Sequence, residues 1–388
     1  MARTFIESPD AVNGATGDAV TWLWSVLTGT VTYDTTVKNN GAGSWEADST
    51  AGNTVSDLRR DGVITGTSRV TGYFYYDSTP SATAAIIRAV DASANIGWQL
   101  RITTGNVLNI HGGSGGTLNK SGATTLSTAT WYRISVGWTL SSTSSFTINV
   151  YLNGTLEIAA TGADGTIEGA SPTRIRFGWV TAPGASKNIY FQNIITDDGS
   201  GNDDIGNYYT TAKLPAADGT LVEFTTAIGG AAGAHFDDVA ERPGAEANGW
   251  SIATTLIKTE EYSIQGVAVG DVDLTGLTLL DFMGWVRAKI SATSGTPVTN
   301  IILAGSASAI TLTTSYATYL KMAGSTTYPV GLVDIGMNGL AASSRTFSLA
   351  ECGIVFAYNP TASGATVIPV PINRVMKNRT QTSSVQAY

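Results

Sequence analysis

The chain contains 388 residues, carries a net charge of −8, and has only 13% charged residues. Average soluble proteins have about 25%, and phosphate binding needs clustered lysine and arginine, so nucleic acid is excluded as an expected partner. One cysteine and two histidines exclude a disulfide framework and a cysteine-based zinc site. The apolar stretches are too short for a membrane-spanning helix, and the first residues show no secretory leader. We therefore expect synthesis in the cytoplasm and no membrane insertion.

Alternation of apolar and polar residues with a period of two dominates the first half of the chain. Residues 68–77, 131–138 and 146–152 all alternate, as strands with one buried face require. Asn153-Gly154 then tolerates positive φ at both positions, which predicts a type I′ hairpin. Further strands are expected at 96–103, 106–110, 155–160, 173–180 and 188–196. Many short strands joined by Gly, Ser, Asn and Asp turns predict a β-sandwich or jelly roll.

The second half has the same style without repeating the sequence. Strands are expected at 250–257, 263–269, 278–290, 299–304, 317–322, 330–337 and 346–357. Cys352 lies inside the last of these alternating runs, so we expect it to be buried as a small apolar side chain. The prediction is an all-β chain of two β-sandwich, jelly-roll domains in tandem.

Composition marks the connection between the two domains. Residues 197–246 contain ten acidic and two basic residues, which equals the whole net charge, because the remainder holds 20 of each sign. The last 30 residues contain three prolines and no acid, which predicts an extended arm that a neighbouring subunit holds. Arg374, Lys377 and Arg379 are the expected assembly residues of this arm. The expected divisions are an N-terminal arm at 1–20, a first sandwich at 21–197, an acidic connector at 198–222, a second sandwich at 223–358 and the arm at 359–388.

Candidate acidic sites are few. Asp197, Asp198, Asp203 and Asp204 cluster in one turn, and clustered oxygens suit calcium. The cluster lacks the spacing of an EF-hand, so a solvated acidic turn without any cofactor is the preferred interpretation. A retaining glycosidase needs two carboxyls about 5–5.5 Å apart. Residues 92–156 contain no acidic residue, which argues against that activity in the first domain. We predict no catalytic residue.

A glycine-rich run and three aromatic residues are the other candidate binding sites. His111 precedes the glycine-rich run 112–116, but no helix or Gly-Lys-Ser/Thr follows, so a hairpin loop is expected rather than a phosphate site. Exposed aromatic rings can stack on sugars, and Trp98, Tyr75 and Trp285 are the glycan-binding candidates. For each of these three rings, a place in the core is the preferred interpretation.

The order of the strand motifs resembles concanavalin A-like, laminin G-type jelly rolls, particularly those of bacteriophage virion proteins. The motifs that carry this resemblance are Trp131-Tyr132-Arg133-Ile134, Tyr151-Leu152-Asn153-Gly154, Arg174-Ile175-Arg176-Phe177-Gly178 and Ile189-Tyr190-Phe191-Gln192-Asn193-Ile194. The second half is similar in style to carbohydrate-binding jelly rolls, through Tyr262-Ser263-Ile264-Gln265, Gly284-Trp285-Val286-Arg287 and Thr314-Ser315-Tyr316-Ala317.

The resemblance implies a non-enzymatic structural protein at the virion surface, acting as a capsid decoration or a head or tail fibre-type component. Its implied partners are further copies of itself and other virion proteins of the capsid or tail. The alternative is an adhesin that binds host-surface glycans, and a glycosidase-like enzyme is the third reading. The charge-poor composition agrees with assembly, since low charge limits repulsion between crowded copies.

Overall fold

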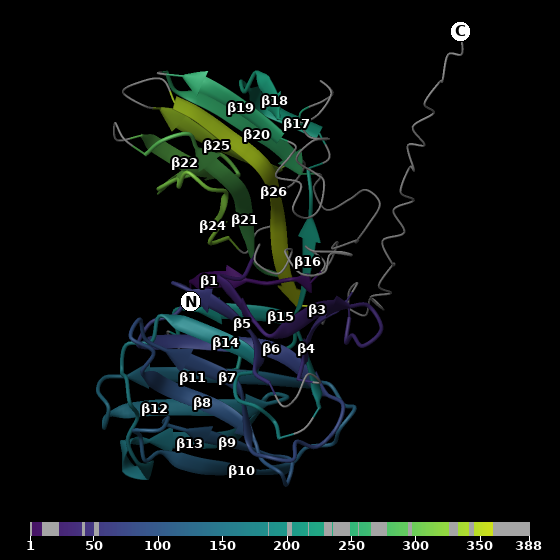
Figure 1. Cartoon of the computed structure of the whole chain (residues 1–388), viewed down its shortest axis with the longest axis vertical. Coiled ribbons are helices and arrows are strands. Elements are labelled where there is room, and N and C mark those ends of the chain that lie inside the picture. The colour runs from purple at the N-terminus through teal and green to yellow at the C-terminus, as the bar shows by residue number, and fades with distance from the viewer. Residues whose placement is uncertain are drawn as a thin grey trace.

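The structure is a computed structural model, and it describes residues 2–9, 23–40, 43–49, 54–184, 186–199, 204–215, 217–228, 235, 249–254, 256–264, 278–293, 297–325, 333–340 and 345–359. Nearly all regular secondary structure of the described residues is β-strand, and a short 3₁₀ helix lies at Gly162–Asp164, so the predicted all-β class is confirmed. Figure 1 shows two β-sandwiches stacked along the long axis of the molecule. Within the described segments, no helix has the length and apolar character needed to cross a membrane.

Two antiparallel sheets form the first sandwich, and we call them sheet A and sheet B. Sheet A follows the order β13-β12-β11-β6-β15-β4-β3, with β1 also pairing with β15. Its strands are β1 (Arg3–Ile6), β3 (Thr30–Asp34), β4 (Ser44–Asp48), β6 (Thr67–Tyr76), β11 (Tyr132–Leu140), β12 (Phe146–Leu152), β13 (Thr155–Thr161) and β15 (Asn188–Asp197). Sheet B follows the order β10-β9-β8-β7-β14-β5-β2. Its strands are β2 (Val26–Thr28), β5 (Ser56–Asp61), β7 (Ala84–Val90), β8 (Ile96–Ile102), β9 (Val107–His111), β10 (Asn119–Thr125) and β14 (Arg174–Trp179).

The inward faces of sheets A and B build the core of the first sandwich. Trp98 of sheet B meets Trp138 of sheet A edge to face, with ring centroids 5.0 Å apart. Alternation along β12 puts every second residue in this core, as the sequence pattern predicts. Asn153 and Gly154 have φ values of 50° and 91° between β12 and β13, which confirms the predicted hairpin turn.

The second sandwich pairs a six-stranded sheet C with a five-stranded sheet D. Sheet C contains β16 (Tyr209–Lys213), β18 (Thr226–Ile228), β19 (Gly249–Thr254), β21 (Thr278–Ile290), β24 (Ala317–Met322) and β26 (Arg345–Asn359). Sheet D contains β17 (Ala217–Val222), β20 (Lys258–Ile264), β22 (Val298–Leu303), β23 (Ser306–Ile310) and β25 (Val333–Leu340). Cys352 is fully buried in β26, as predicted, and burial raises the pKa of its thiol well above the ordinary value.

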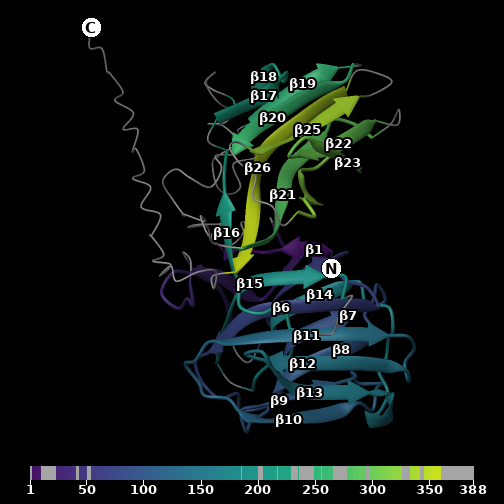
Figure 2. The ribbon, with the colours of Figure 1, turned by 180° about the vertical axis from the view of Figure 1, so that it is seen from behind.

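The junction between the sandwiches is built by segments that the sequence analysis placed outside the domains. The expected N-terminal arm contributes β1, which pairs with β15 and contacts β21, β24 and β26 of the second sandwich. The expected acidic connector contains β16 and β17, which belong to sheets C and D. Figure 2 shows β26 running down to this junction and β16 running up from it, antiparallel to β26. These strands correct the predicted limits, because backbone pairing extends both domains into polar sequence.

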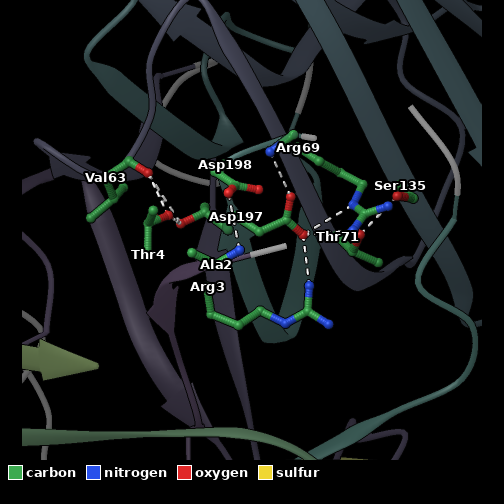
Figure 3. A network of polar contacts seen from close by, with 11 residues as sticks. Ala2, Arg3, Thr4, Val63, Arg69, Thr71, Ser135, Asp197 and Asp198 are labelled. Carbon is green, nitrogen blue, oxygen red and sulfur yellow. Dashed lines mark hydrogen bonds and ion pairs between the residues drawn. The ribbon is translucent and has the colours of Figure 1, made fainter. Parts of the chain in front are cut away.

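A buried ion-pair network lies where β1 meets sheet A (Figure 3). The Asp197 carboxylate accepts hydrogen bonds from Arg69 Nη2 at 2.7 Å and from Arg3 Nη1 at 2.8 Å. Asp197 and Arg69 are each only 1% exposed. Thr4 Oγ1 beside them donates to the Val63 carbonyl, so polar contacts tie β1 to two separate parts of the first sandwich. Because the network is shielded from water, removing one charged side chain would leave an uncompensated buried charge on its partner.

Candidate functional site

A row of polar side chains crosses the outer face of sheet B. Cross-strand pairing aligns one residue from each of six neighbouring strands, so their side chains leave the sheet on the same side. From β5 to β10 the row reads Arg59, Arg176, Arg88, Gln99, His111 and Asn119. Trp98 and Leu100 flank Gln99 and point into the core, which fixes the row on the outside.

The middle of the row is a connected chain of hydrogen bonds. Arg88 donates from Nε and Nη2 to Gln99 Oε1, at 3.1 and 2.9 Å. Gln99 Nε2 lies 3.4 Å from His111 Nδ1, which also accepts a hydrogen bond from the Gly113 backbone N–H at 3.0 Å. Because Nδ1 accepts from Gly113, this network assigns the neutral ring the tautomer with its proton on Nε2.

A second, parallel row lies two residues further along the same strands. Arg101 of β8 pairs with Asn109 of β9, which pairs with Ser121 of β10. Asn109 Nδ2 donates to Asn119 Oδ1 at 2.7 Å and to Ser121 Oγ at 3.2 Å, so the amides of both rows are held in place. The two rows define what we call the arginine–amide face.

The arginine–amide face carries excess positive charge. Arg176 forms a two-point ion pair with Asp57, and Arg59 pairs with Asp61. Among the described residues no carboxylate forms an ion pair with Arg88 or Arg101, so the four guanidinium groups of the face outnumber the carboxylates of Asp57, Asp61 and Glu168 around them. Burial, together with the neighbouring Arg176 charge, lowers the pKa of Arg88 to about 10, and burial also lowers the pKa of Arg101.

The imidazole of His111 is held neutral by the same surroundings. Burial and then the Arg101 charge lower its pKa, while the Glu168 carboxylate opposes them. An anion bound to the arginine–amide face would offset the Arg101 charge and so raise the pKa of His111. His111 is therefore the group of the face whose charge responds to a bound ligand near neutral pH.

The glycine-rich loop after His111 closes one end of the face. The Glu168 carboxylate accepts hydrogen bonds from the Ile96 and Gly115 backbone N–H groups and from the Ser114 hydroxyl. These hydrogen bonds outweigh partial burial and lower the pKa of Glu168. A Cβ on Gly113 would stand 2.6 Å from Glu168 Oε2, so this loop needs glycine to wrap a side chain of the protein itself. This agrees with the predicted structural loop.

The structure separates the predicted glycan-binding aromatics. Trp98 is fully buried in the core of the first sandwich, and Trp285 is 1% exposed, packed with the apolar residues of the junction. These two predictions are corrected, since a ring without an accessible face cannot stack on a sugar. Tyr75 is partly exposed on the outer face of sheet A, against Trp131 and Tyr190.

The predicted acidic cluster is not brought together around a common point. The carboxylate of Asp197 binds Arg3 and Arg69, Asp198 accepts the Ala2 backbone N–H, and Asp204 pairs with Arg133 at 2.6 Å. Over the described ranges no cluster of three or more metal-binding side chains is found. Asp203 and the arm residues Arg374, Lys377 and Arg379 lie outside the described residues.

Sequence reasoning missed the arginine–amide face. Its members are spread from residue 59 to residue 121 and again at residue 176, and each strand contributes one or two polar residues. The available signal was the polar residue between apolar neighbours in strands such as Gly97–Ile102 and Ile175–Phe177. Reading it requires the strand order, because β14 inserts between β5 and β7 although it is far from both in sequence.

Comparison with known proteins gives similarity in fold. No protein-family model matches the chain, and no curated protein matches it. Among solved structures, the cellulose-induced protein Cip1 is 19% identical with a TM-score of 0.36, and the match covers 50% of this chain and 90% of Cip1. An endo-β-1,4-glucuronan lyase from the fungus Trichoderma reesei is 12% identical with a TM-score of 0.39, covering 52% and 98%. Domain 4 of the extracellular arabinanase AbnA from Geobacillus stearothermophilus, in complex with arabinotriose, is 15% identical with a TM-score of 0.33, covering 51% and 93%. At such low identities and TM-scores, these likenesses do not bear on what this chain binds.

Proposed function

We propose that this protein binds an acidic glycan on the arginine–amide face. The observation that carries the proposal is the row itself, with guanidinium, amide and imidazole groups aligned one per strand. Guanidinium groups bind carboxylate or sulfate through two parallel hydrogen bonds. The exposed Asn119 amide both donates and accepts, which suits sugar hydroxyls, whereas Gln99 is 2% exposed and holds the Arg88 guanidinium in place.

The spacing of the row supports a chain-like ligand. Neighbouring strands lie about 4.8 Å apart, so successive polar groups repeat at about that interval across the sheet. This interval is close to the length of one pyranose unit in an extended polysaccharide. A linear glycan lying across the strands would therefore present one sugar to each strand, with its acidic groups toward Arg176, Arg88 and Arg101.

We propose binding without turnover. Guanidinium groups remain charged and amides do not titrate, so neither is suited to general acid–base work at neutral pH. The carboxylate that acts on the pKa of His111 is Glu168, and its oxygens already accept hydrogen bonds from the protein. Prolonged incubation with the bound polysaccharide should release no new reducing ends and no unsaturated sugars. Release of either product would show that the face is an active site.

The proposal is tested by calorimetric titration of the full chain with polygalacturonate and, as the neutral comparison, with dextran. We expect the acidic polymer to bind, and we expect Arg88→Ala to weaken that binding without changing the titration with dextran. Affinity should fall steeply as salt is added, because exposed charge–charge attraction is screened within about 8 Å at physiological ionic strength. Equal affinity for both polymers, unaffected by salt, would refute the charge-based proposal.

Affinity for the acidic glycan should rise as the pH is lowered from about 8 to about 5, through the titration range of histidine. The pKa of unliganded His111 is lowered by burial and Arg101, and a bound anion raises it, so binding takes up a proton as the pH falls. Most carboxylates remain ionised over this range. Calorimetry in two buffers of different ionisation enthalpy measures the proton uptake. In His111→Gln the pH dependence should flatten, and an unchanged slope would assign it to another group.

We also propose that the protein is carried at a virion surface as a homo-oligomer. The resemblance of its strand motifs to phage virion jelly rolls and its charge-poor composition support this proposal. In that setting the arginine–amide face would serve attachment to host-surface glycans. Sedimentation velocity of the full chain is expected to show an oligomer, and a monomer at micromolar concentration would count against assembly through the chain alone.

A further inference from the structure

The opposite side of the first sandwich carries a second cross-strand row, of different chemistry. On the outer face of sheet A, Thr32 pairs with Glu46, Glu46 with Tyr190, and Tyr190 with Tyr75. Trp131 immediately precedes β11 and continues the row beyond Tyr75. We call these five residues the tyrosine–tryptophan row. It lies on the other sheet from the arginine–amide face and shares no residue with it.

Three aromatic rings form one end of the tyrosine–tryptophan row. The Tyr75 ring is 5.5 Å from Trp131 and 5.4 Å from Tyr190, between centroids. Tyr190 is 6% exposed and packs edge to face against Tyr75, whereas Tyr75 and Trp131 remain partly exposed. Tyr75 therefore has one edge fixed against protein while part of its ring meets solvent. Such rings offer contact area to a ligand, and because they are already held in place, little side-chain conformational entropy is lost on binding.

Hydrogen-bonding groups flank the rings on one side. Glu46 Oε1 accepts from Tyr190 Oη at 2.9 Å and from Asn188 Nδ2 at 2.7 Å. Glu46 Oε2 accepts one contact, from Thr32 Oγ1 at 3.3 Å, and a carboxylate oxygen can accept two. This carboxylate is partly exposed, so Oε2 has capacity for a hydroxyl donor from a ligand.

The charge around the tyrosine–tryptophan row is negative. Burial raises the pKa of Glu46, and the nearby carboxylates of Asp34 and Asp48 raise it further. Like charges repel, so an acidic sugar is disfavoured here, in contrast to the arginine–amide face. A neutral pyranose combines an apolar ring face with hydroxyl donors, which matches aromatic rings beside an acceptor.

We propose that the tyrosine–tryptophan row is a second carbohydrate site, selective for neutral sugars. A pyranose would stack on Trp131 and Tyr75 and donate a hydroxyl hydrogen bond to Glu46. The chain would then bind an acidic glycan on one sheet and a neutral glycan on the other.

The test is a titration of the full chain with neutral hexasaccharides, namely β-1,4-glucan, β-1,3-glucan, β-1,4-mannan and α-1,4-glucan, followed by calorimetry and tryptophan fluorescence. At least one should bind, and Trp131→Ala should weaken it by about tenfold or more, the effect of losing an aromatic anchor. Tyr75→Ala should also weaken binding. Trp131→Phe keeps an aromatic ring and should retain most of the affinity, so it serves as the conservative control for Trp131→Ala. Glu46→Gln should shift selectivity among the sugars, because an amide oxygen accepts less strongly than a carboxylate.

Arg88→Ala is the matched control on the opposite sheet, and it should leave neutral-sugar binding unchanged. The proposal fails if none of the four hexasaccharides binds at millimolar concentration. It also fails if one binds and neither Trp131→Ala nor Tyr75→Ala alters its affinity. Binding of the acidic polymer is measured separately on the same variants, so the two proposed sites can be refuted independently of each other.

Discussion

Replacing Asp197 with alanine should destabilise the first sandwich by about 3–5 kcal/mol, the usual consequence of removing one partner from a buried ion pair. The carboxylate is 1% exposed and accepts hydrogen bonds from both Arg69 and Arg3. Without it, two guanidinium groups remain near one another in a site with little access to water. Urea denaturation monitored by tryptophan fluorescence measures the change in the free energy of unfolding.

Asp198→Ala is the matched control for Asp197→Ala. Asp198 is the next residue in sequence, and its Oδ2 accepts the Ala2 backbone N–H in an exposed contact at 3.0 Å. Exposed polar contacts contribute little, so this variant should change stability by less than about 1 kcal/mol. Equal losses in the two variants would contradict the role assigned to the buried network.

Asp197→Ala should also loosen the junction between the sandwiches. Arg3 belongs to β1, and β1 contacts β21, β24 and β26 of the second sandwich. Hydrogen exchange in β1 should therefore accelerate in Asp197→Ala at urea concentrations where both sandwiches remain folded. Unchanged exchange in β1 would show that backbone pairing with β15 holds the strand without the ion pair.

Arg88→Ala should weaken binding of the acidic polymer by about thirtyfold or more, since truncating a partly desolvated charge at an interface commonly costs 2–5 kcal/mol. Arg88 stands at the centre of the row, and no ion pair within the described part of the chain neutralises it. Its removal also releases Gln99, whose Oε1 accepts both of the guanidinium hydrogen bonds. Calorimetric titration with polygalacturonate measures the loss.

Lys38→Ala is the control for Arg88→Ala, because it removes the same charge from an exposed position away from sheet B. It should change affinity by less than about threefold, the scale of a screened long-range charge. If both variants weaken binding equally, net charge and not the arginine–amide face governs the interaction. Arg88→Lys separates charge from geometry, since lysine keeps the charge and loses the two-point contact.

The secondary structure of this chain was largely predictable because many strands alternate apolar and polar residues. In β12 this alternation matches burial on one side, and Asn153-Gly154 marks the turn after it. In β11 the polar residues of the alternation are buried as well, because that strand lies in the middle of sheet A. Prediction was poorer where strands are short or polar. The segment Asn119–Thr125 forms β10 with mostly exposed side chains, and the hydrophobic pattern contains no trace of it.

The candidate sites depended on contacts between distant residues. Trp98 and Trp285 were reasonable glycan-binding candidates by residue type, but both are buried, one under sheet A and one at the junction. Tyr75 packs against Trp131 and Tyr190, and this contact follows from the strand order of sheet A. Asp197 ends a strand in an acidic stretch of sequence, but its carboxylate binds Arg69, which is 128 residues away.

By itself, the sequence determined the all-β class, the presence of two sandwiches, the hairpin after β12 and the burial of Cys352. These features follow from local patterns, in which each residue is judged against neighbours within a few positions. The tertiary structure alone decided which polar residues share a sheet face, because strand order sets cross-strand neighbours and no local pattern encodes that order. For this reason Arg59, Arg176 and Arg88 stand in one row on β5, β14 and β7, although 117 residues separate Arg59 from Arg176.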